Sequence, residues 1–206
     1  MMCRVISGLT AQTTQKLLLD AGAFFKNYNM VAVEGTESVP ADTFESAVAA
    51  GKLLGATKGG GSFTAVPTFR PIEVDGARGE LKGMKILETW EIKMGATLVE
   101  VSAETLKDAL AISSIDTESN TTHDVITGNM CLKPTDYIDN ITWVGNLSGS
   151  EETVVIQIFN ALNTKGLELS VEDKAEATIE TEFVGHFDMA KVNEVPFAIY
   201  YPKQTV

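Results

Sequence analysis

The chain has 206 residues, of which 44% are hydrophobic and 21% are charged. A chain of this length buries about 70% of its unfolded surface, so it can form a stable core without disulfides or a metal. The formal net charge is −12, which argues against a nucleic-acid-binding surface because phosphate contacts need clustered Lys and Arg. No apolar run reaches 18 residues, so no transmembrane helix is expected.

The amino-terminal region has no regular periodicity. Residues 1–15 are polar and are expected to form a loose arm of a single domain that spans 1–206. A basic region followed by a signal-type apolar core is missing, so synthesis in the cytoplasm is expected. In that compartment Cys3 and Cys131 are expected to be reduced thiols rather than a disulfide.

The first expected elements are a strand and a short helix. Residues 17–28 are apolar and favour a strand, although the Leu17 to Leu19 run is also compatible with the end of a helix. Residues 31–41 are then expected to be a connection. Asp42 followed by Glu45 has the spacing of a capping box and predicts a short helix after it. Such a helix is either a flap packed on its own domain or a contact with a neighbouring subunit. The residues expected at such a contact are Phe44, Val48, Leu53 and Leu54.

The run Gly59-Gly60-Gly61 resembles a phosphate-binding loop only at first sight. It lacks the Gly-Lys-Ser/Thr ending of a P-loop and the GxGxxG spacing of a dinucleotide site. A β-prone segment follows directly, so the glycines are expected to bend or bulge a strand or to allow a close approach of another backbone.

The longest regular pattern lies between residues 72 and 98. Apolar and polar side chains alternate up to Asp75-Gly76, a dipeptide suited to a tight turn, and alternate again from Met84 to Leu98 with Glu88 as the only misfit. A β-hairpin is therefore predicted. The apolar parity changes after Leu98, which predicts a β-bulge or a strand that changes the sheet it packs on.

The second half of the chain predicts one helix and several strands. Ser102 is a good N-cap for a helix that ends at Leu110, and residues 113–122 are polar enough to be a surface loop. Residues 141–147 and 154–159 predict another hairpin. A strand from 175 to 187 and a last strand from 195 to 201 follow. The face of the strand that points away from the core is acidic, with Glu176, Glu180 and Glu182.

No catalytic, metal-binding or cofactor-binding residues are predicted. His123 and His186 are far apart in sequence and belong to no metal-binding motif, and GNLSG at 145–149 lacks the spacing of a nucleophile elbow. The patterns together predict a mainly β fold, an antiparallel β-sandwich or partly open barrel with one or two flanking short α-helices.

Three stretches carry a resemblance to a known family: LLLDAGAFFKNY at 17–28, GATKGGGSFTAVPTFRPIEVDG at 55–76, and YIDNITWVGNLSG at 137–149. The chain, from roughly Leu9 to Lys203, resembles the tail tube (major tail) proteins of long-tailed bacteriophages and prophages of Gram-positive bacteria. The resemblance implies a structural virion protein, not an enzyme, whose hexameric rings stack into a hollow tube. Its partners would be copies of itself and tail proteins such as the tape measure, tail terminator and baseplate or distal tail proteins. DNA would pass through without specific binding, and no membrane would be involved.

Other functions stay open. A monomeric β-sandwich ligand-binding module is the first alternative and a small enzyme the second, but only 7% of the residues are aromatic, which is little for an aromatic-lined site. Contractile tails, flexible tails and phage-derived bacteriocins are not distinguished. In a tube, the face with Glu176, Glu180 and Glu182 is expected to line the lumen, because a wall without cations does not retain phosphates. The alternative is a solvated outer face.

Overall fold

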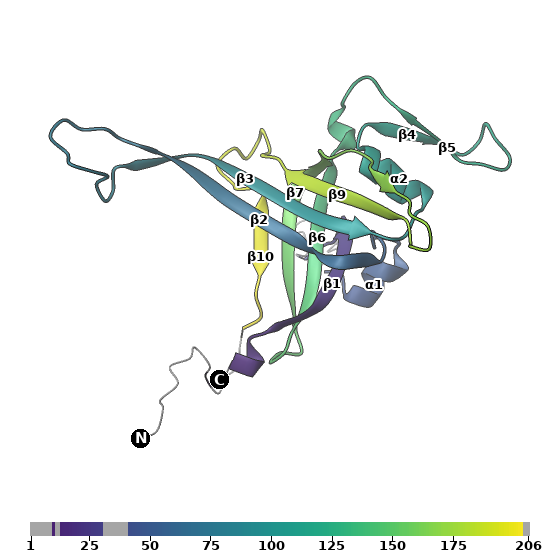
Figure 1. Cartoon of the computed structure of the whole chain (residues 1–206), viewed down its shortest axis with the longest axis horizontal. Helices are drawn as coiled ribbons and strands as arrows, with labels where there is room; N and C mark the ends of the chain where they lie inside the picture. Colours follow the sequence, from purple (N-terminus) through teal and green to yellow (C-terminus); the bar gives the residue numbers. More distant parts are fainter. Residues whose placement is uncertain (1–9, 11–12, 31–40, 204–206) are drawn as a thin grey trace.

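The computed structural model describes residues 10, 13–30 and 41–203. Within these residues the chain forms an eight-stranded antiparallel sheet, a separate two-stranded sheet and two short α-helices (Figure 1). The strands of the large sheet are β1 (Leu18–Lys26), β2 (Thr57–Pro71), β3 (Lys85–Leu98), β6 (Ile138–Leu147), β7 (Thr153–Asn163), β8 (Leu169–Ser170), β9 (Thr178–Gly185) and β10 (Phe197–Tyr200). The remaining elements are η1 (Thr13–Gln15), α1 (Phe44–Ala49), α2 (Ala103–Leu110), β4 (Ser113–Asp116), β5 (Val125–Gly128) and η2 (Pro134–Asp136).

The large sheet folds over on itself at β7. Its strand order is β1-β6-β7-β9-β3-β2, and β10 and β8 pair with β7 and β9. The first part of β7 pairs with β10, whereas its last three residues, 161–163, pair with β9. In Figure 1, β2 and β3 cross the direction of β6, β7 and β10 at a steep angle. The mainly β, antiparallel sandwich class predicted from the sequence is confirmed.

The core lies between the two layers of the folded sheet, one containing β3 and β9 and the other containing β1, β6 and β7. Alternate side chains of β3 and β9 meet those of β1, β6 and β7, as a strand with one buried face requires. The central residues are almost inaccessible: Ile158 and Ile179 are 0% exposed and Phe183 is 1% exposed. A second cluster around Phe25 and Val155 lies on the other face of the β1-β6-β7 layer, where α1 contributes Ala47.

The glycine run bends β2 and brings it close to β1, as predicted. The pairing with β3 shifts register between Thr57 and Gly61. A Cβ on Gly61 would lie 2.2 Å from the ring of Phe24 and 2.6 Å from the carbonyl oxygen of Gly95. Only a residue without a side chain fits there.

Both predicted helices are present, with one change in capping. Ser102 caps α2 by accepting a hydrogen bond from the Thr105 amide at 3.1 Å. The box that caps α1 lies one residue later than expected, since Thr43 and Ser46 exchange the two hydrogen bonds. Asp42 is instead used in contacts with the residues that follow β1 and the segment after the helix, described below.

Several strands differ from the predictions. Residues 113–116, expected in a surface loop, form β4, because pairing with β5 satisfies those of their backbone groups that point toward it. β2 ends at Pro71, so Ile72 and Val74 lie in the connection to β3. The irregularity of β3 lies at Glu88, the misfit of the alternation, rather than after Leu98 where the strand ends.

Several predictions concern residues outside the described part of the chain. They are residues 1–9, 11 and 12 of the loose amino-terminal segment, which include Cys3, and residues 31–40 of the expected connection. Cys131 is described and is an exposed free thiol.

Candidate assembly surfaces

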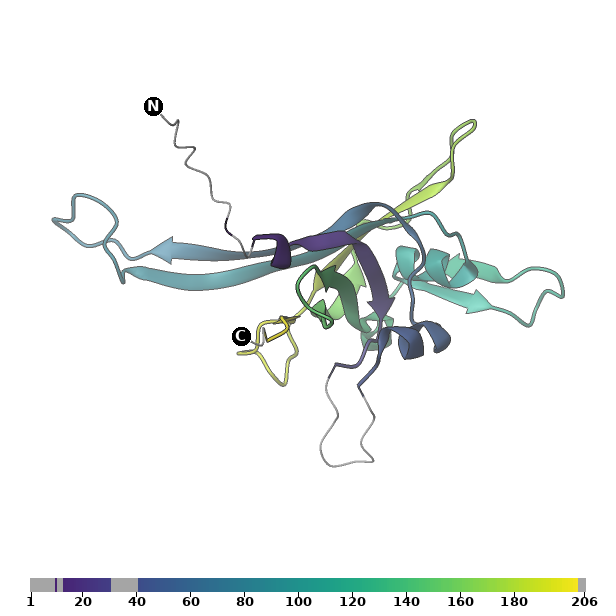
Figure 2. The same ribbon diagram turned by 90° about the horizontal axis from the view of Figure 1, so that it is seen from below.

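The hairpin of β2 and β3 is much longer than the layer that it belongs to. The two strands have 15 and 14 residues, and Figures 1 and 2 both show the distal half projecting away from all other strands. We call residues 66–89 the arm. Its position outside the body means that its side chains have no other layer of the same subunit to pack on.

One apolar row of the hairpin continues from the core into the arm. Paired residues of an antiparallel ladder share a face, and Pro67 with Trp90 follows the core pairs of this row. The ring of Trp90 is still covered, with its centre 5.8 Å from that of Phe197. The next pair, Phe69 with Leu87, has no such cover and is 52% and 47% exposed.

The bulge at Glu88 gives the arm an apolar side chain on its opposite face as well. Thr68 pairs with Thr89 but Phe69 pairs with Leu87, so Glu88 is left over and Ile86 moves to the face opposite Leu87. Glu88 is bonded to Arg70 at 2.9 Å. The exposed apolar residues of the arm are Val66, Phe69, Ile72, Val74, Leu81, Ile86 and Leu87. Such a concentration on one projection is typical of an interaction surface.

The β2 edge of the arm is protected against strand addition. β2 is the last strand of the large sheet, and its distal half contains Pro67 and Pro71, which have no amide hydrogen to donate to a neighbouring strand. A partner is therefore expected to contact the faces of the arm rather than to add a strand beside β2.

The predicted contact segment around α1 divides into an outer and an inner half. Phe44 and Val48 are 44% and 41% exposed, as a contact with a neighbour requires. Leu54 is 5% exposed, and its amide donates to the Phe24 carbonyl at 2.9 Å. Leu53 packs beside Phe25. Leu54 thus belongs to the core of its own subunit, which corrects its assignment to a subunit contact, whereas Leu53 is only partly buried.

Asp42 connects this segment to the residues that follow β1. Its carboxylate accepts hydrogen bonds from the Lys52 ammonium at 2.5 Å and from the Asn29 amide at 2.8 Å. Burial raises the pKa of Asp42, but these hydrogen bonds and the charge of Lys52 outweigh it, so the pKa lies below its ordinary value. The ionised carboxylate of Asp42 therefore holds the α1 segment in place.

Substitution of Asp42 by Asn is expected to reduce the free energy of unfolding by about 1–3 kcal/mol at neutral pH, because the charged hydrogen bonds are lost. A group with a lowered pKa stabilises the fold above its unfolded pKa of about 4, and this contribution disappears as the pH falls through the folded value. Urea unfolding of the wild type and of D42N should therefore converge below about pH 4. The exposed-turn variant D75N is the control, and a difference that is independent of pH would contradict the assignment.

The predicted acidic face is a face of mixed charge. β9 pairs with β3 so that Glu180 lies beside Thr97 and Glu182 beside Gly95. Each predicted glutamate has a lysine partner from another segment. The pairs are Lys58 with Glu176 at 3.1 Å, Lys93 with Glu182 at 3.6 Å, and Lys165 with Glu180.

Charged side chains of β3 and β9 therefore share one face. Lys93 contacts Glu91 at 2.7 Å on its own strand as well as Glu182 of β9. We call the set Lys58, Glu91, Lys93, Lys165, Glu176, Glu180 and Glu182 the charged face. The hydrogen bond with Glu91 and the charges of Glu182 and Glu91 hold the pKa of Lys93 above its ordinary value. The face carries four carboxylates and three ammonium groups, so its net charge is small.

The histidines occupy separate environments. His123 lies in an exposed loop with its Nδ1 2.7 Å from the Thr122 hydroxyl, and His186 lies with its ring edge-to-face against Tyr137 at 5.1 Å between centres. Among the described residues, no three His, Cys, Asp or Glu side chains are grouped to hold a metal ion. None of the described helices is long and apolar enough to span a membrane.

Comparison with known families and with curated proteins found no match for this chain. The residues of the arm were not singled out by sequence reasoning. The signal that could have found them is the misfit at Glu88, because a bulge in a long hairpin changes which side chains share a face.

Proposed function

We propose that this chain is a structural virion protein that polymerises as stacked hexameric rings into a phage tail tube, the conduit for DNA ejection. The observation that carries the proposal is the arm, which projects from the body with exposed apolar side chains on both faces. The family resemblance of the sequence contributes the ring and tube arrangement. The protein would be made in the cytoplasm of the bacterial host and function in the virion tail.

The arm fits a contact between identical subunits. A projecting surface that binds a different surface of the next copy makes a head-to-tail contact, and such contacts generate rings or filaments. Phe44 and Val48 of α1 supply a second exposed apolar site on the body. Other tail proteins, such as the tape measure, tail terminator and baseplate or distal tail proteins, would bind the ends or interior of the assembly.

The charged face is proposed to line the lumen. Its lysines are each paired with a carboxylate of the same subunit, so they are less available to the phosphates of passing DNA. A wall that does not bind phosphates allows DNA to move without salt-dependent retention.

Electron microscopy and sedimentation velocity of concentrated protein test the proposal. The isolated subunit is expected to stay monomeric at low concentration, because a protein with exposed strand edges must be kept from polymerising too early. Rings or tubes are expected at high concentration or after tail-initiation proteins are added. A protein that stays monomeric under both conditions would contradict the tube and favour the alternative, a monomeric β-sandwich ligand-binding module.

A further inference from the structure

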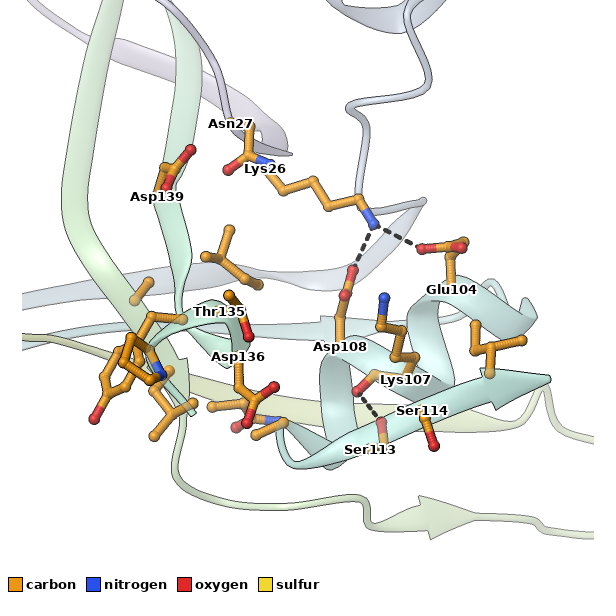
Figure 3. Close-up of a pocket in the computed structure, with 18 of the residues that line it drawn as sticks. Lys26, Asn27, Glu104, Lys107, Asp108, Ser113, Ser114, Thr135, Asp136 and Asp139 are labelled. Carbon is orange, nitrogen blue, oxygen red and sulfur yellow. Dashed lines mark hydrogen bonds and ion pairs between the residues drawn. The ribbon is translucent and has the colours of Figure 1, made fainter. Parts of the chain in front are cut away.

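A cavity of about 970 Å³ lies between α2, β4, η2 and the adjoining ends of β6 and β7 (Figure 3). One of its walls is formed by the successive residues Ser113, Ser114 and Ile115, whereas none of its lining residues comes from the described strand β5. Successive side chains of a strand point to opposite faces. A strand that presents one face to a cavity would line it with every second residue only. Three consecutive residues line this cavity, so the edge of β4 away from β5 faces it.

This edge of β4 is open. Among the described residues, β4 is paired with β5 alone. In an antiparallel pair, alternate residues direct their N–H and C=O groups away from the partner strand. The free edge of β2 is protected by Pro67 and Pro71, but β4 contains neither proline nor glycine. An unprotected edge of this kind accepts an added strand.

The charges around the cavity select the kind of strand. Figure 3 shows Lys26 reaching across to α2, where its ammonium contacts Asp108 at 2.8 Å and Glu104 at 3.2 Å. The Lys26 ammonium is thus already paired with carboxylates of its own subunit. Asp136 and Asp139 lie on the side opposite α2. In total, four carboxylates and two ammonium groups line the cavity, which favours a cationic occupant.

We propose that this cavity binds an extended basic segment of a partner protein, which adds to β4 as a third strand and places Lys or Arg side chains near Asp136 and Asp139. The volume is at the upper end of the range of about 300–1,000 Å³ that is usual for ligand sites. A second copy of the chain is a poorer occupant, because its net charge of −12 would be brought to an already acidic site. The proposal goes beyond polymerisation and does not depend on it.

The test uses the unassembled full chain and a fluorescent octapeptide of alternating Lys and Val, with binding followed by fluorescence anisotropy. The control peptide has the same sequence with alternate backbone nitrogens methylated, so it keeps the charge but cannot extend a sheet. The unmodified peptide is expected to bind at least tenfold more tightly and to slow hydrogen exchange at Ser113–Asp116. Equal binding of the two peptides, or protection of β1 or β10 in place of β4, would overturn the proposal.

Two charge variants test whether the carboxylates of the cavity contribute to peptide binding. D139N is expected to weaken peptide binding about twofold to fivefold, as for an exposed ion pair, and the difference should shrink as salt is added. D173N removes a carboxylate from a distant exposed loop and is expected to bind the peptide as the wild type does. An equal loss in both variants would overturn the site. Protection of β4 that grows with protein concentration without peptide would show that a second copy occupies the cavity, and would also overturn it.

Discussion

A chain carrying F69K and L87E is expected to stay folded but to lose polymerisation. Phe69 and Leu87 are a cross-strand pair on the arm, each about half exposed and without cover from its own subunit. Complete burial of such a side chain contributes about 1.5–3 kcal/mol, so burial of the exposed half of both contributes about 1.5–3 kcal/mol in total. Its loss should raise the concentration needed for assembly by about tenfold to a hundredfold. Lys opposite Glu is a favourable cross-strand pair, which keeps the hairpin itself intact.

The matched control places the same two charges on the neighbouring cross-strand pair. T68K with T89E alters polar residues of the arm on its other face, and it is expected to impair assembly less than F69K/L87E because it removes no apolar side chain. Sedimentation velocity and electron microscopy measure assembly, and circular dichroism measures folding. Normal tubes from F69K/L87E would remove this face of the arm from the subunit contact.

Replacing Glu176, Glu180 and Glu182 together by Gln is expected to make assembled tubes retain DNA at low salt. The substitution leaves Lys58, Lys93 and Lys165 without these partners. Lys93 keeps Glu91 and Lys165 keeps Glu168, so only Lys58 is freed completely and the other two lysines are freed in part. If the charged face lines the lumen, these lysines reach the phosphates of DNA. Each lysine that does so should steepen the fall of log affinity with log salt by about 0.9.

DNA retention and ejection rate are measured at several salt concentrations, and retention should disappear as salt is raised. E118Q with E151Q and E152Q is the control, because it removes the same charge from exposed loops. This test needs assembled tubes, so it is read only after assembly of both variants has been verified by microscopy. Tubes that eject DNA like the control at low salt would place the charged face on the outside.

Local chemistry made several elements predictable from the sequence alone. The alternation of β3, the Ser102 cap of α2 and the bend at Gly59–Gly61 each depend on residues close together in the chain, and all three are present. A period of two, a side-chain cap and a missing Cβ act on the backbone within a few residues, so their effect can be read without knowledge of the fold.

Partners distant in sequence decided the rest. Leu54 is buried and Leu53 partly buried because β1 lies beside them, and residues 113–116 are a strand because they pair with β5. Lys93 neutralises Glu182 only because β3 and β9 are neighbours. The sequence by itself determined the strand-rich class and the residues that alternate. The tertiary structure alone decided which faces are covered, since burial and ion pairing depend on which strands lie side by side.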